Sequence, residues 1–295
     1  MFLLVGGDSE IGAATHLHLR TLGKIVVATT RRLEFASSDR PLLDLATDLS
    51  SWEPPRGTSA ACIFTAMARL AACAEDPAGS AHINVVQTLT LVERLIAWNV
   101  YVLFLSSNQV FDGSVPQVRA EAPASPVSEY GRQKARAEAA LRERMLRGEP
   151  IGILRLAKVL APTMPLLRGW VRALSAGEPI RAFHDMTMAP TPMEQVSSAI
   201  AALLESRASG VFQLTGPEDV SYANVAYHVA RQLGADPALV GSVGAIDAGM
   251  PEGSAPRHTT LDSSAMWHRF GITTPGPWSV LDAIVQRARR ERSDS

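Results

Sequence analysis

The sequence predicts an α/β fold, a doubly wound parallel sheet with helices on both faces, followed by a smaller C-terminal α/β lobe. Three observations support this prediction. In the first half of the 295 residues, short apolar segments alternate with helical segments. A glycine-rich turn follows the first apolar segment at once. After about Val159 prolines interrupt the chain, which marks a second unit, and the length fits two units at roughly 150 residues per domain.

The first half supplies the strands and helices of the sheet in alternation. Apolar or β-branched runs predict strands, and apolar positions at helical spacing predict helices. The expected strands are Phe2–Val5, Lys24–Thr29, Ala60–Phe64, Val100–Ser106 and Ile151–Leu156. The expected helices are Ile11–Leu22, Ile83–Trp98 and Ser128–Arg147. Residues 1–157 therefore form the first predicted domain.

Residues 158–295 form the predicted smaller lobe. Helices are expected over Ser197–Glu205 and Tyr222–Leu233, with a short strand over Gly210–Thr215. Segments around residues 190–216 are expected to return to the main domain. The stretch Gly241–Pro256 is rich in Gly, Ala and Pro and predicts a long loop, and the charged tail Arg287–Ser295 is expected to fray.

Composition excludes several functional classes. Lys plus Arg is 28 and Asp plus Glu is 29, a net charge of −1, which argues against binding to a nucleic-acid backbone. We find neither a run of about 18 apolar residues nor the features of a signal peptide, so we expect a cytoplasmic protein with no membrane partner. Cys62 and Cys73 are too few for a disulfide framework, and the histidines lack ligand spacing, so no metal is expected.

The turn after the first strand is the first candidate binding site. Backbone N–H groups at a helix N-terminus bind a pyrophosphate, and glycines allow the tight turn and the close packing of helix on strand. Ser9 stands where the middle glycine of a GxxGxxG pattern would be, and a purely structural turn is the alternative. The preferred interpretation is that residues 1–157 are a Rossmann-like domain that binds a dinucleotide. Its expected contacts here are Gly6, Ser9, Glu10, Ile11 and Gly12.

Residues after the second and third segments indicate which dinucleotide binds. The acidic residue of NAD-preferring sites is missing after the second strand, where Arg31 and Arg32 stand. Because arginine pairs well with a phosphate, NADP(H) is favoured over NAD(H), and the alternative is a pair of solvated arginines. Asp44 and Leu45 are expected at the adenine, although such an Asp is as often a turn cap.

Tyr130 and Lys134 give the sharpest chemical signal. Four residues apart, they share one face of a helix, where the ammonium would lower the phenol pKa from its usual value of about 10. Such a tyrosine can transfer a proton at a carbonyl or alcohol oxygen. Ser107, at the end of a strand, could hydrogen-bond the same oxygen. The three residues predict a hydride-transfer triad, and the alternative is an ordinary exposed helix pair.

Together these motifs resemble the extended short-chain dehydrogenase/reductases, and among them the dTDP-4-dehydrorhamnose reductases and their sugar-nucleotide relatives. The matching blocks occur in family order over essentially the whole chain. They are Gly6–Gly12, Ile83-Asn84-Val85, Ser106–Gly113, Tyr130–Lys134 with Glu138, Ile153-Leu154-Arg155, Pro190-Thr191, and Pro256-Arg257 with Leu261-Asp262. The resemblance implies an NADP(H)-dependent reductase of a keto-sugar nucleotide, with residues 158–295 as its substrate-binding lobe. Tyr130 would donate the proton, Ser107 would polarise the carbonyl, and Lys134 would also hold the nicotinamide ribose.

Departures from the family pattern leave the substrate open. Asn108-Gln109 replaces an Asp-Tyr pair, and because amides cannot act as acids or bases near neutral pH, dehydratase chemistry is disfavoured. Substrate contacts are expected from Asn108, Gln109, His184 and Arg257. An epimerase with retained NAD(P) and a non-catalytic nucleotide-binding regulatory subunit stay as alternatives. The resemblance also implies a homodimer, and it places Asn84 near the active site, which helix structure alone would explain equally well.

Overall fold

A computed structural model describes residues 1–161, 164–250 and 255–293. Its centre is a six-stranded sheet in the order β10-β5-β4-β3-β1-β2, in which every neighbouring pair is parallel. The strands are β1 (Phe2–Val5), β2 (Val26–Ala28), β3 (Ala60–Ile63), β4 (Tyr101–Ser107), β5 (Ile151–Leu156) and β10 (Gly210–Leu214). The prediction of an α/β fold on a parallel sheet is confirmed.

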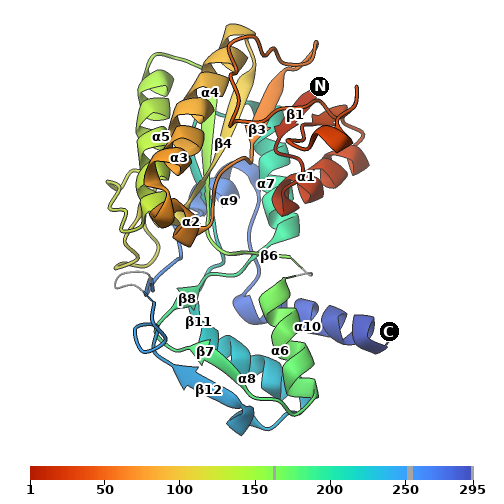
Figure 1. The fold of residues 1–295 in the computed structure, drawn as a ribbon, viewed down its shortest axis with the longest axis vertical. Coiled ribbons are helices and arrows are strands. Elements are labelled where there is room, and N and C mark those ends of the chain that lie inside the picture. The colour runs from red at the N-terminus through yellow and green to blue at the C-terminus, as the bar shows by residue number, and fades with distance from the viewer. Residues whose placement is uncertain (162–163, 251–254, 294–295) are drawn as a thin grey trace.

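Helices cover both faces of this sheet (Figure 1). On one face α1 (Glu10–Thr21) packs beside α7 (Met193–Ser206), and on the other lie α4 (Thr88–Ala97) and α5 (Glu129–Leu146). Side chains alternate along each strand, so Leu4 joins the apolar cluster under α1 and α7, whereas Leu3 and Val5 join the cluster under α4 and α5. Burial on both faces explains why the strands are almost wholly apolar.

The strand order reverses beside β1. The chain leaves β1 towards β2 and leaves β3 towards β4, so the loops after β1 and β3 diverge. Such a reversal leaves a crevice at the carboxyl ends of the two strands, where ligands bind in sheets of this kind. The glycine-rich turn lies there, directly after β1.

A buried ion pair holds α5 on the sheet. Arg155, on β5, donates from Nε and Nη2 to both carboxylate oxygens of Glu138, on α5, at 2.6 to 3.2 Å, and both side chains are buried. Arg155 Nη1 also donates to Gln213 Oε1 on β10, at 3.1 Å. The pair therefore ties α5, which carries Tyr130 and Lys134, to two strands of the sheet.

The smaller lobe has its own apolar core below the sheet (Figure 1). It contains α6 (Pro165–Ser175), α8 (Tyr222–Leu233) and α10 (Pro277–Ser293). Its strand pairs are β7 (Ile180–Phe183) with β12 (Val240–Val243), and β8 (Thr187–Met188) with β11 (Val220–Ser221). A separate short pair, β6 (Val159–Leu160) with β9 (Thr191–Pro192), stands between the two units.

Two sequence predictions are wrong in this lobe. The loop expected over Gly241–Pro256 begins as strand β12, because these residues pair in register with β7; residues 251–254 lie outside the described chain. The tail expected to fray from Arg287 continues α10 to Ser293, because Leu281, Ile284 and Val285 anchor that helix in the lobe's core. Residues 294–295 are not described.

Within the described ranges, no helix is both long and apolar enough to cross a membrane.

Candidate dinucleotide and catalytic site

A cavity of about 280 Å³ opens where the strand order reverses. Its wall comes from the turn after β1, the segments after β2 and β3, and the start of the helical region that leads to α4. The lining residues are Gly6, Asp8, Ser9, Arg31, Leu43, Asp44, Leu45, Phe64, Thr65, Ala66, Met67 and Ile83. Five residues predicted to bind a dinucleotide thus share one cavity: Gly6, Ser9, Arg31, Asp44 and Leu45.

The glycine-rich turn is built for close approach. Gly6 has φ +87°, and a Cβ there would lie 2.7 Å from Thr65 Cγ2. Ser9 caps α1: its Oγ accepts the N–H of Gly12 at 3.0 Å and donates to the Gly6 carbonyl at 2.9 Å. The Ser9 side chain therefore bonds to its own turn and helix. A serine in place of the middle glycine of the pattern thus leaves the turn intact. Glu10 and Ile11 form the first turn of α1.

The donor set of the cavity fits a nicotinamide dinucleotide. The N-terminus of α1 supplies the partial positive charge that a pyrophosphate needs. Thr65 Oγ1 is buried in the wall and has no hydrogen-bond partner among the described residues, a condition that a ligand oxygen or hydroxyl would relieve. Asp44 Oδ1 accepts the N–H of Ala46 at 2.9 Å, so this residue caps its turn and lines the cavity at once.

The two arginines after β2 differ in their surroundings. Arg31 lines the cavity, whereas Arg32 Nε contacts Asp8 Oδ2 at 3.4 Å. Asp8 also accepts hydrogen bonds from Thr30 Oγ1, at 2.6 Å, and from Arg40 Nη2. Burial raises the pKa of Asp8, but the bonds from Thr30, Arg40 and Arg32 outweigh it and hold that pKa below its ordinary value. Asp8 was missed at the sequence level, because Arg40 lies 32 positions away along the chain.

The start of α5 lies directly on the segment that follows Ser107. Ser107 ends β4, and a Cβ on Gly131 would collide with the carbonyl oxygen of Gln109. Ser128 caps α5 by accepting the N–H of Gly131 at 3.0 Å, and its hydroxyl donates to Gln109 Oε1 at 3.2 Å. The structure therefore brings Tyr130, at the first turn of α5, to the carboxyl end of β4.

Lys134 is buried against β4. Its Nζ donates to the carbonyl of Leu105 at 2.8 Å and lies 4.3 Å from the centroid of the Phe104 ring. Desolvation lowers the pKa of Lys134 to about 8, although the charge of Glu138 opposes that shift.

Tyr130 differs from the sequence prediction. Lys134 Nζ lies 5.9 Å from the centroid of the Tyr130 ring, and burial raises the pKa of the phenol, with Cys73 adding to the rise. The predicted lowering of this pKa by Lys134 is therefore wrong for this arrangement, because desolvation outweighs a charge at that distance. The phenol keeps its proton near neutral pH.

The residues around Ser107 form a short turn. Ser107 Oγ accepts the N–H of Gln109 at 3.2 Å and lies 3.4 Å from Asn108 Oδ1, to which its hydroxyl donates. Asn108 thus stands beside the predicted catalytic hydroxyl. The Gln109 side chain accepts a hydrogen bond from Ser128, the cap of α5. This contact fixes the start of the helix, whereas the sequence predicts that Gln109 binds the substrate.

Asn84 joins the cavity wall to α5. It lies in a π-helical turn, η2 (His82–Gln87), that interrupts the single helix expected over Ile83–Trp98. Its Oδ1 accepts the N–H of Met67 at 2.8 Å, and its Nδ2 donates to the Met67 carbonyl at 3.0 Å and to Gln133 Oε1 at 2.7 Å. Gln133 sits between Tyr130 and Lys134 in sequence. In the sequence, Gln133 is distinguished only as an amide on the buried face of α5.

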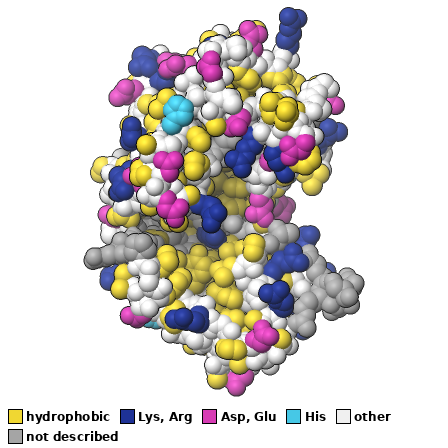
Figure 2. Space-filling view, viewed as in Figure 1, with side chains coloured by type: hydrophobic (Ala, Val, Ile, Leu, Met, Phe, Trp, Pro, Cys, Tyr) yellow, Lys and Arg dark blue, Asp and Glu magenta, His cyan; other side chains and the backbone are white. Residues whose placement is uncertain are grey.

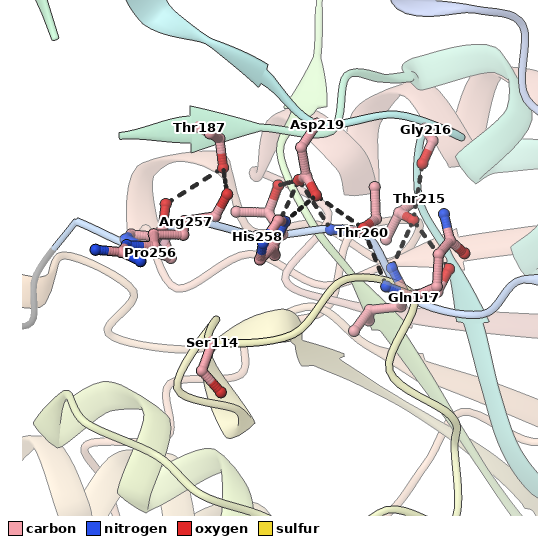
Figure 3. A network of polar contacts seen from close by, with 12 residues as sticks. Ser114, Gln117, Thr187, Thr215, Gly216, Asp219, Pro256, Arg257, His258 and Thr260 are labelled. Carbon is pink, nitrogen blue, oxygen red and sulfur yellow. Dashed lines mark hydrogen bonds and ion pairs between the residues drawn. The ribbon is translucent and has the colours of Figure 1, made fainter. Parts of the chain in front are cut away.

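Arg257 lies on a strap, residues 256–260, that joins the two units (Figure 3). Thr187 Oγ1 donates to the carbonyls of Pro256 and Arg257, and Asp219 Oδ1 accepts the N–H groups of Thr259 and Thr260 at 2.7 and 3.1 Å. The strap also reaches the main domain.

Three further contacts place the strap and the remaining predicted ligand. The N–H of His258 donates to the carbonyl of Gly113 at 3.0 Å, and its Nδ1 lies 3.1 Å from Asp219 Oδ2. His184, exposed at the end of β7, donates its N–H to Val243. Figure 2 shows the molecule hollowed between its two units, with apolar side chains in the hollow and basic ones at its edges. Of the four predicted substrate ligands, Arg257 lies on the strap between the two units, whereas Asn108 lies in the main domain beside Ser107.

Comparison with known proteins agrees with this architecture. The model of the RmlD substrate binding domain matches residues 1–289. A dTDP-4-keto-6-deoxy-D-glucose reductase of Streptomyces niveus is 31% identical over 184 residues, which is 62% of this chain and 62% of that protein. The chain thus matches under two thirds of that relative's length.

Solved structures extend the likeness of the fold to the whole chain. A dTDP-4-dehydrorhamnose reductase from Clostridium acetobutylicum superposes with a TM-score of 0.81 at 16% identity, over 98% of this chain and 99% of that one. A UDP-glucose 4-epimerase from Thermus thermophilus, in complex with NAD, gives a TM-score of 0.80 at 20% identity, over 98% of each chain.

Proposed function

This chain belongs to the family of the RmlD substrate binding domain, among the extended short-chain dehydrogenase/reductases, and on that premise we propose that it is an NAD(P)H-dependent reductase of a keto-sugar nucleotide. The observation that carries the proposal is the placement of Tyr130, Lys134 and Ser107 at the carboxyl end of β4. Asn84 and Gln133 join α5 to the wall of a cavity that fits a dinucleotide.

The chemistry divides between the coenzyme and three side chains. A reduced nicotinamide, when bound, would supply the hydride to the carbonyl carbon of the sugar. Ser107 donates a hydrogen bond to the carbonyl oxygen, and Tyr130 gives that oxygen its proton. A phenol whose pKa is raised by burial enters the reaction protonated, as a proton donor must. Lys134, fixed on the Leu105 carbonyl, would hold the nicotinamide ribose and would add positive charge as the phenolate forms.

Arg31 supports the narrower proposal that NADPH is the preferred coenzyme. Arg31 lines the cavity beyond β2, and its guanidinium could pair with a 2′-phosphate. Arg32 lends less support, because Asp8 already engages it.

Coenzyme oxidation against nucleotide-linked 4-keto-6-deoxy sugars tests the reductase. We expect loss of reduced-nicotinamide absorbance with at least one sugar. Tyr130→Phe should lower turnover by about 10²- to 10⁴-fold and leave coenzyme affinity unchanged. Tyr227→Phe, on the exposed side of α8, is the matched control.

Three outcomes would redirect the proposal. Full activity of Tyr130→Phe would contradict the role of the phenol. Sugar interconversion without net coenzyme consumption would indicate an epimerase. Tight coenzyme binding without turnover of any sugar would indicate a regulatory subunit.

A further inference from the structure

A carboxylate lies in the cavity wall beside the segment that follows β2, although residues 29–32 of that segment include no acidic residue. Asp8 comes from the turn after β1, yet its Oδ2 accepts a 2.6 Å hydrogen bond from Thr30, two residues beyond β2. In NAD-preferring folds of this type, the acid that binds the ribose 2′-hydroxyl lies at the end of the second strand. Asp8 therefore brings a carboxylate to the same place from a different part of the chain.

Asp8 also engages two of the three arginines at this end of the cavity. Arg32 Nε lies 3.4 Å from Oδ2, and Arg40 Nη2 contacts Oδ1. Both guanidinium groups also lie over the ring of Phe35, at 4.2 and 5.7 Å from its centroid, which restricts their movement further. The third, Arg31, lines the cavity.

A 2′-phosphate and a 2′-hydroxyl would meet this cluster differently. The phosphate needs charge-assisted hydrogen bonds from guanidinium groups, and those of Arg32 and Arg40 are directed at Asp8. The negative charge of Asp8 also repels a phosphate at close range. A ribose hydroxyl, in contrast, can donate to the carboxylate, which lines the cavity and is 19% exposed.

We propose that Asp8 determines coenzyme selectivity: by engaging Arg32 and Arg40 at the end of β2, it weakens binding of a 2′-phosphorylated coenzyme relative to one with a free 2′-hydroxyl. This inference rests on the proposed use of a nicotinamide coenzyme. It predicts that NADH is accepted beside NADPH in the natural protein, and that removal of one carboxylate charge moves the preference towards NADPH.

Binding of two coenzyme fragments tests the proposal without any turnover. Calorimetry at one fixed ionic strength would compare adenosine 2′,5′-bisphosphate with adenosine 5′-monophosphate, and NADPH with NADH. Asp8→Asn keeps the size of the side chain and removes its charge. We expect the ratio of affinities, 2′-phosphorylated over unphosphorylated, to rise on the order of tenfold, the size of one hydrogen bond to a charged group.

Control variants separate the local effect from net charge and from misfolding. Asp236→Asn removes the same charge from an exposed cap in the smaller lobe and should leave the ratio unchanged. Adding Arg32→Ala and Arg40→Ala to Asp8→Asn should cancel the gain. Thermal melting would verify that each variant is folded.

Three results would overturn the proposal. An unchanged ratio in folded Asp8→Asn would show that the carboxylate does not discriminate. A fall in the ratio would show that Asp8 presents the arginines to the phosphate instead of withholding them. If none of the fragments binds, the cavity does not hold adenosine and the proposal fails. A failed reductase assay with selective fragment binding would leave this inference standing.

Discussion

The cavity at the end of the sheet and the strap beside the smaller lobe are held in place by different forces. Apolar strands buried on both faces position the cavity, and the ladder between β1 and β3 fixes the turn and loop that form its wall. The strap has little buried apolar surface and is fixed by Asp219, Thr187 and the carbonyl of Gly113. Changes at the first region should therefore reduce global stability, and changes at the second should act mainly on substrate binding.

The largest effect is expected from the buried pair in the main domain. Arg155→Ala leaves Glu138 charged and buried, so the free energy of unfolding should fall by about 3–5 kcal/mol. Urea denaturation measures this. Lys24→Ala breaks the half-exposed pair with Glu205 and should cost under about 1 kcal/mol. Equal losses in both variants would contradict the assignment of stability to the buried pair.

Lys134 should make stability depend on alkaline pH. Desolvation lowers its pKa from 10.5 to about 8 in the folded protein, so between these values the unfolded chain binds more protons. Stability of the natural protein relative to Lys134→Met should therefore rise from pH 8 to 10.5, by about 3 kcal/mol. Unfolding free energies of both proteins at the two pH values measure it. Parallel pH curves would show that Lys134 is not desolvated.

Asp219 tests the polar anchoring of the strap. Asp219→Ala removes the acceptor of two backbone N–H groups, so stability should fall by about 1–3 kcal/mol and amide exchange at Thr259 and Thr260 should accelerate. KM for the sugar nucleotide should rise through Arg257, while coenzyme affinity stays constant. The same substitution at Asp236, a cap in the same lobe, is the control. A change in coenzyme affinity would contradict the separation of the two regions.

The smallest effect comes from a matched pair of helix caps. Ser128 caps α5 in the main domain and Ser221 caps α8 in the smaller lobe, each by accepting one backbone N–H, at 3.0 and 3.1 Å. Either change to alanine should cost about 1 kcal/mol of stability. Only Ser128→Ala should lower turnover, because it also loosens the contact between Gln109 and the helix of Tyr130. Equal turnover in the two variants would indicate that this contact has no catalytic role.

Sequence reasoning succeeded where local pattern decides structure. Phe2–Val5 and Ile151–Leu156 are strands over the predicted bounds, and Ser128 begins the predicted helix as its cap. These elements are long or strongly patterned, and both sheet faces are buried, so their apolar content is unambiguous.

The sequence did not predict the polar contacts between distant segments. Asp8 meets Arg40 across 32 positions, Asn84 meets Gln133 across 49, and Asp219 meets Thr259 across 40. Nothing in the local sequence distinguishes such side chains from solvated ones. The roles of Ser107, Tyr130 and Lys134, and of the predicted substrate ligands, stay predictions until turnover is measured.

The return of the chain to its own sheet has a consequence for synthesis on the ribosome. Strand β10 completes the sheet beside β5, and α7 covers one face, yet both are translated after α6 and β7 of the smaller lobe. Until residue 214 has emerged, the nascent chain exposes the edge of β5 and an uncovered apolar face. The main domain therefore cannot finish folding before much of the smaller lobe is made, and arrested or truncated chains that end near residue 157 should depend on chaperones to stay soluble.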